Sequence, residues 1–181
     1  MTHVQARPLR WMTALGVFLF LVLGTGWSQG AEPAPSPDRA RFAGTYKIDE
    51  WKSREHRGMY HFFYLDPDGT FLLAASWKEF ESSKIAGTWS LVGGRVELQG
   101  VADVQTNRGS WRVDFHRSFT VETQTPAPVL KPIPEKNRYG MMGWPSTFTL
   151  VSPKPEPNLP DGSIPADRKE IGKLIAKIQK G

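Results

Sequence analysis

Lys84–Leu98 reads KIAGTWSLVGGRVEL and carries the clearest structural signal in the chain. Apolar residues alternate with polar ones on both sides of Gly93-Gly94, in TWSLV before the pair and in RVEL after it. A period of two is typical of a strand with one buried face. A glycine pair supplies the positive φ angles that a tight hairpin turn needs. The stretch therefore predicts a β-hairpin with one face in a core.

This stretch contains the triplet Gly-Thr-aromatic, as Gly87-Thr88-Trp89. The same triplet occurs twice elsewhere, as Gly44-Thr45-Tyr46 and Gly69-Thr70-Phe71. Glycine at the start of a curved strand lets the backbone bend and lets neighbouring strands approach. The aromatic residue two positions later returns to the glycine's side of the strand. We therefore predict that Gly44, Tyr46, Gly87 and Trp89 form the floor of a β-barrel. Chance recurrence in a chain with 17 glycines is the alternative.

Other runs rich in β-branched and aromatic residues follow at short spacing and predict an antiparallel meander. In Asp66-Pro67-Asp68-Gly69 the proline presets one turn position and the glycine allows positive φ, which predicts a second hairpin. The body has no amphipathic helix to cover a flat sheet, so the sheet must close or fold into two layers. We predict an all-β fold, an antiparallel up-and-down β-barrel of about eight strands with one C-terminal amphipathic α-helix. The expected strands are 42–51, 59–65, 70–77, 85–92, 95–101, 110–122 and 146–151.

The order AGTY, DGTF, AGTW and RVEL, over about residues 42–100, resembles the small bacterial lipocalin-like barrels. It is most similar to the N-terminal domain of copper-resistance and envelope-stress lipoproteins. The resemblance implies a lipocalin-like barrel in the cell envelope. It does not imply copper binding, because the Cys-x-x-Cys of that family is missing between Trp51 and Arg57, and the lipid-attachment cysteine is missing too.

The N-terminal segment of the chain predicts an exported protein. Residues 1–30 contain Arg7 and Arg10, the apolar run WMTALGVFLFLVL and small residues before Ala31, which together indicate a signal peptide. A retained anchor is the alternative, but the run is shorter than the ~20 residues of a spanning helix. We expect a periplasmic location, with an extracellular one left open. The expected segments are a signal peptide (1–30), an Ala/Pro-rich linker (31–40), a lipocalin-like barrel (41–152), a Pro-rich linker (153–165) and an amphipathic helix (166–181).

The chain has 23 Lys and Arg, 18 Asp and Glu and no cysteine. The absence of cysteine excludes disulfides, thiolate metal sites and cysteine nucleophiles. Residues 166–181 contain five basic and two acidic residues, so the excess of positive charge belongs largely to this tail and to the leader. A basic nucleic-acid-binding face in the body is therefore not expected.

The tail predicts a helix with a narrow apolar stripe formed by Ile171, Leu174, Ile175 and Ile178 and with lysines opposite. Two roles are compatible with this pattern. The stripe packs on the barrel wall, or the helix makes a peripheral contact with an anionic membrane or a protein partner. We favour packing on the wall, because four aliphatic residues are a modest membrane anchor.

No arrangement of residues indicates catalysis. No serine–histidine–aspartate arrangement can be read from the sequence. It also contains no nucleophile-elbow motif, phosphate-binding loop or dinucleotide-binding glycine pattern. Asp66-x-Asp68-Gly69 lacks the downstream glutamate of a calcium loop. The histidines that could ligate copper lack the spacing of a recognised site; they are His56, His61 and His116. We predict a protein without enzymatic activity, metal or cofactor.

Aromatic and methionine residues gather late in the chain, around KNRYGMMGWPS. Exposed, they would form an adaptable apolar recognition loop; buried, they would plug one end of the barrel. The candidate ligand-binding residues are Trp111, Tyr139, Met141, Met142 and Trp144. The sequence thus predicts a periplasmic binding module for a small apolar ligand or a peptide segment. The alternative is a non-enzymatic envelope interaction or structural protein with a filled barrel, which acts through its C-terminal helix and loops.

Overall fold

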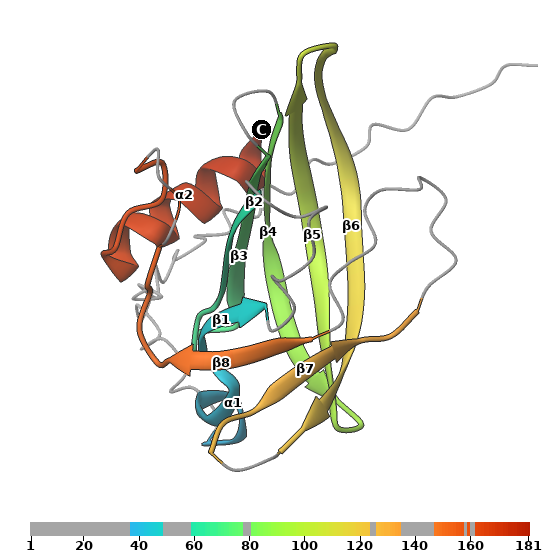
Figure 1. Ribbon diagram of the computed structural model, residues 1–181, viewed down its shortest axis with the longest axis vertical. Helices are drawn as coiled ribbons and strands as arrows, with labels where there is room; N and C mark the ends of the chain where they lie inside the picture. Colours follow the sequence, from blue (N-terminus) through green and yellow to red (C-terminus); the bar gives the residue numbers. More distant parts are fainter. Residues whose placement is uncertain are drawn as a thin grey trace, which may run out of the picture. The chain divides into compact units, whose positions relative to one another are not determined.

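The computed structural model describes residues 37–48, 59–77, 81–123, 126–134, 147–157, 159 and 162–181. Within them, the strands form a closed antiparallel barrel in the order β1 to β8 (Figure 1). Each strand pairs with the next one in the sequence, and β8 pairs with β1. The predicted fold class, an all-β barrel of about eight strands with a C-terminal helix, is confirmed. The elements are α1 (Pro37–Phe42), β1 (Gly44–Ile48), β2 (Met59–Leu65), β3 (Thr70–Trp77), β4 (Glu81–Val92), β5 (Arg95–Thr106), β6 (Gly109–Glu122), β7 (Val129–Pro132), β8 (Phe148–Ser152) and α2 (Arg168–Lys180).

The two hairpin turns lie where the sequence predicts them. Gly93 and Gly94 have φ angles of 56° and 75° between β4 and β5, which side chains other than glycine rarely adopt. In the turn between β2 and β3, the Asp66 amide donates to the Thr70 carbonyl at 2.8 Å, and Gly69 has φ 96°. The boundaries of β2 and β3 are those expected from the sequence.

The barrel interior is lined by one face of every strand. Interior residues are the odd-numbered ones in β2, β3, β4 and β6 and the even-numbered ones in the other strands, as the pairing of Phe63 with Leu73 and of Leu73 with Ile85 illustrates. Much of this space is filled by rings, since Phe63 lies 5.1 Å from Phe148 and 5.9 Å from Phe119 between ring centroids. The buried interior cluster comprises Phe42, Ala43, Tyr46, Phe63, Leu65, Phe71, Leu73, Ile85, Trp89, Val96, Leu98, Ala102, Phe119, Leu130 and Phe148.

Strands β4 and β5 approach each other closely at a pair of facing glycines. Gly87 pairs with Gly100, and a Cβ atom built on Gly87 would lie 2.0 Å from the Gln99 carbonyl oxygen. A Cβ on Gly100 would lie 2.1 Å from the Ala86 carbonyl oxygen. Any side chain here would force the two strands apart, so glycine permits this close approach of the strands.

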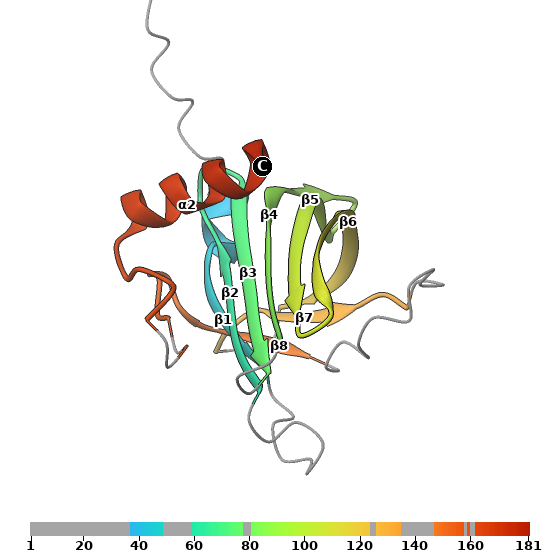
Figure 2. The ribbon, with the colours of Figure 1, turned by 90° about the horizontal axis from the view of Figure 1, so that it is seen from above.

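Helix α2 lies outside the barrel and packs against β3, β4 and β5 (Figure 2). Ile171, Ile175 and Ile178 are buried, and Leu174 is partly buried. These side chains meet an outward-facing apolar surface of the barrel wall formed by Phe62, Tyr64, Leu72, Ala74, Ala86 and Val101. In the described chain the apolar stripe of the tail is therefore covered by the barrel itself.

Both ends of α2 are also tied by polar contacts. At its first residue, Arg168 donates through Nε and Nη2 to the two carboxylate oxygens of Asp66, at 2.7 and 2.5 Å. Burial alone would raise the pKa of Asp66, but the hydrogen bonds from Arg168 and from the Asp68 amide outweigh it and hold that pKa below its ordinary value. At the last turn, Arg112 of β6 donates to the carbonyls of Ile178 and Gln179.

Strands β4 and β5 are longer than the expected 85–92 and 95–101, and three further segments differ in kind from the sequence-based expectation. Residues 37–42, placed partly in an extended linker, form helix α1, which starts with proline and carries arginines in its last turn, a usual pattern for helix ends. Strand β7 (Val129–Pro132) was missed because prolines flank it. The Pro-rich segment 153–165 is not simply solvated, since Leu159 and Ile164 are buried under α2.

Candidate binding pocket beside α1

The three Gly-Thr-aromatic triplets contribute buried rings to the same interior cluster. Tyr46, Phe71 and Trp89 are each at most 2% exposed. The Tyr46 hydroxyl donates to the Phe42 carbonyl at 2.7 Å, which attaches β1 to the end of α1. Burial raises the pKa of Tyr46, so this hydroxyl keeps its proton and remains a donor.

Trp89 joins β4 to the turn between β2 and β3. Its indole Nε1 donates to the Asp66 carbonyl at 2.7 Å, and its backbone amide donates to the Gly69 carbonyl at 2.7 Å. The guanidinium of Arg39 lies over the Trp89 ring, 5.5 Å from its centroid, and Nη1 of Arg39 donates to the Asp68 carbonyl at 3.2 Å. Helix α1 therefore lies against this end of the barrel, which we call the α1 end.

A pocket of about 520 Å³, partly open to solvent, lies at the α1 end. Its walls come from α1, from the end of β4 and the turn to β5, and from the end of β6 with the residue that follows it. Figure 1 shows these elements together at the same end of the barrel. Its volume falls within the ~300–1,000 Å³ typical of sites for small molecules. The lining residues are Asp38, Arg39, Arg41, Phe42, Ser90, Leu91, Gly94, Val121 and Thr123. We call this the α1 pocket.

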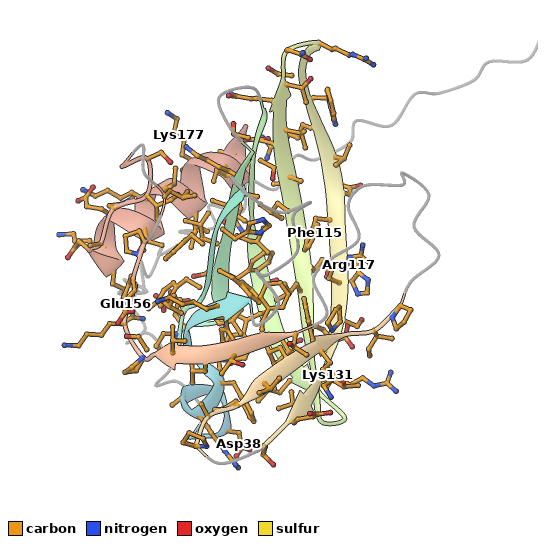
Figure 3. The ribbon with its side chains drawn as sticks, in the orientation of Figure 1. Asp38, Phe115, Arg117, Lys131, Glu156 and Lys177 are labelled. Carbon is orange, nitrogen blue, oxygen red and sulfur yellow. The ribbon has the colours of Figure 1, made fainter. Side chains whose placement is uncertain are left out.

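The α1 pocket combines an apolar wall with a charged rim. Phe42, Leu91 and Val121 belong to the interior cluster or pack against it, so the wall is continuous with the core. The charged lining residues are Asp38, which is labelled in Figure 3, and the guanidinium groups of Arg39 and Arg41. A surface of this composition can bury an apolar body and hydrogen-bond a charged group.

Of the residues that the sequence suggests for ligand binding, Trp111 is described and does not line this pocket. Trp111 is 40% exposed on β6 near the turn between β5 and β6, which is at the other end of the barrel (Figure 1). Tyr139, Met141, Met142 and Trp144 lie outside the described residues.

One charged residue inside the barrel was not anticipated. Arg117 shares a face of β6 with Phe115 and Phe119 and pairs in register with Leu98, so it points to the interior (Figure 3). It is 8% exposed and has an interaction partner of its own. The sequence indicates this position only through the alternating run SWRVDFHRSF, in which Arg117 falls on the same face as Phe115 and Phe119.

The residues considered as metal ligands remain scattered where they are described. Among the described residues, no group of three His, Asp or Glu side chains could hold a metal ion. His61 lies on β2, whereas His116 lies on β6 with its Nε2 atom 3.5 Å from a Glu97 carboxylate oxygen. His56 lies outside the described residues. Within the described part of the chain, no helix is long and apolar enough to cross a membrane.

Comparison of the chain with protein-family models, with curated proteins and with solved structures gave no match. The α1 pocket was also missed by sequence reasoning, because its lining is drawn from three segments that lie far apart in the chain. The one local signal was PDRARF, in which a proline at the first helical position and arginines in the last turn indicate a short helix.

Proposed function

We propose that this chain is an exported, lipocalin-like binding protein without enzymatic activity, which holds a small molecule in the α1 pocket. The single observation that carries the proposal is the 520 Å³ pocket whose apolar wall is continuous with the barrel core. The described part of the interior offers less support for a site within the barrel, since large rings occupy it.

The signal-peptide pattern of residues 1–30 and the lipocalin-like order of motifs support export to the periplasm as part of the same proposal. In the periplasm, such a barrel would bind a ligand that is present at low concentration. An open pocket at the end of a rigid barrel suits that task, because a preformed site loses little conformational entropy on binding.

The test is native mass spectrometry of the protein purified from the cells that produce it, with two matched tryptophan variants. Leu91→Trp fills the pocket from its wall, whereas Val92→Trp adds the same bulk at the next position, which is 57% exposed and does not line the pocket. We expect a bound small molecule in the wild type and in Val92→Trp and its loss in Leu91→Trp.

Circular dichroism establishes that each variant is folded, and Val121→Phe replaces Leu91→Trp if the latter unfolds. No bound mass in the wild type, or an equal amount in both tryptophan variants, would contradict the proposal.

A second candidate function is favoured by the packed rings around Phe63. A barrel filled in this way would act as an envelope interaction or structural protein, through its surface and α2, and would not act as a carrier. The same spectra separate the two candidates, because a filled-barrel interaction protein carries no small molecule.

A further inference from the structure

We infer that the α1 pocket selects an amphipathic anion, a molecule with one carboxylate or phosphate group on a short apolar body. This inference rests on the proposed function, since only a pocket that holds a ligand can select one. It concerns the charge of that ligand and the residue that recognises it.

The wall of the pocket sets the apolar requirement. Phe42 is 9% exposed, and Leu91 and Val121 are partly buried against the interior cluster. These three side chains expose hydrocarbon at the base of the pocket, and covering it with an apolar group is favourable at about 25 cal/mol per Å². A fully polar ligand would leave this surface uncovered.

The rim of the pocket sets the charge requirement. It carries two guanidinium groups and a single carboxylate, so its formal charge is positive. Glu122, which follows Val121, has its carboxylate 2.6 Å from the ammonium of Lys131 on β7. Its negative charge is therefore neutralised by that lysine. The field at the mouth consequently favours an anion over a cation.

The two arginines differ in how they are held. Arg39 is half-buried, lies over the Trp89 ring and donates to the Asp68 carbonyl, so its position is set by the barrel. Arg41 is exposed, and its guanidinium lies 5.7 Å from the centroid of the Phe42 ring. Stacked in this way beside the apolar wall, Arg41 can turn its planar N–H donors toward an oxyanion whose apolar part rests on that wall.

We therefore assign Arg41 as the residue that recognises the anionic group, and Arg39 as a supporting positive charge. Because Arg39 lines the pocket and lies over the Trp89 ring, it also links ligand binding to tryptophan fluorescence. A ligand that shifts its guanidinium changes the surroundings of the Trp89 indole, so the tryptophan emission reports occupancy.

The experiment titrates the purified protein with four probes that share one apolar chain: octanoate, octyl phosphate, octanol and octylamine. Tryptophan emission is the readout, and Trp89→Phe identifies the contribution of that indole. We expect at least one anionic probe to bind about tenfold or more tightly than octanol and octylamine, as a charge-assisted hydrogen bond predicts. The carboxylate and phosphate arms show which oxyanion the site prefers.

Two variants that remove one positive charge each test the role of Arg41. Arg41→Gln should weaken binding of the anion about tenfold and leave octanol unchanged. Arg95→Gln is the matched control, because Arg95 is exposed next to the turn between β4 and β5 but does not line the pocket. It should retain the preference for the anion.

Equal binding of octanol and octanoate, abolished by Leu91→Trp, would overturn this inference and leave the proposed function intact. Equal weakening by Arg41→Gln and Arg95→Gln would overturn the assignment of Arg41 and indicate a general field. Failure of all four probes to bind would overturn the inference, and the native mass spectra would decide the proposed function independently.

Discussion

Replacing Trp89 with alanine tests the end of the barrel from which the α1 pocket is built. The indole is 2% exposed, and its removal leaves a large cavity among the rings of the interior cluster. Truncation of a buried tryptophan costs about 3–5 kcal/mol. The hydrogen bond from Nε1 to the Asp66 carbonyl is lost as well, which contributes about 1 kcal/mol of that cost.

Urea denaturation followed by circular dichroism measures this loss as a change in the free energy of unfolding. We expect a lower midpoint at an unchanged slope, and a melting temperature lower by roughly 6–20 °C for a chain of this size. Trp111→Ala is the matched control. Trp111 is 40% exposed, so the same truncation there should cost less than about 1 kcal/mol.

Trp89→Phe separates packing from hydrogen bonding, because it keeps a ring and loses the donor. Its loss in free energy of unfolding should be greater than zero and smaller than that of Trp89→Ala. A loss below about 1 kcal/mol for Trp89→Ala, or equal losses for Trp89→Ala and Trp111→Ala, would refute the view that this indole supports the α1 end of the barrel.

Two further predictions concern the close strand pair and the anchor of α2. Gly87→Ala should prevent folding or cost several kcal/mol in urea melts, since its Cβ would lie 2.0 Å from the Gln99 carbonyl oxygen. Gly172 lies on the exposed face of α2, where an added Cβ would meet nothing within 4 Å, so Gly172→Ala should stabilise the protein by about 0.5–1 kcal/mol. A tolerated Gly87→Ala would contradict the close approach. The pKa of Asp66 is lower in the folded state, so the stability from its contact with Arg168 is present above the ordinary aspartate pKa of about 3.9 and is lost as the pH falls through the folded value. Asp66→Asn should therefore show a flatter decline of melting temperature below about pH 4 than the wild type, and parallel declines would refute the linkage.

Much of the fold could be predicted because it depends on local patterns. The turns at Asp66–Gly69 and Gly93-Gly94 have residues whose backbone preferences specify the turn, and the alternation in β4 and β5 assigns each side chain to a face. Helix α1 and strand β7 were missed, since prolines mark a linker as often as they mark the first turn of a helix or an edge strand.

The candidate site was not predictable in the same way. The pocket depends on how close Phe42, Leu91 and Val121 come, and nothing in the sequence near any one of them records the other two. The residues that composition favoured, such as Trp111, attracted attention because they are large and apolar. Their size says how much area they bury but not where they lie.

By itself the sequence determined that this protein is an all-β chain with tight hairpins and one amphipathic C-terminal helix, because turn chemistry and side-chain periodicity act between near neighbours. Only the tertiary structure decided that the apolar stripe of α2 packs on the barrel wall, that Arg117 faces the interior and that α1 borders a pocket. The reason is physical: closure of the barrel sets the register between distant strands, and register decides which side chains meet.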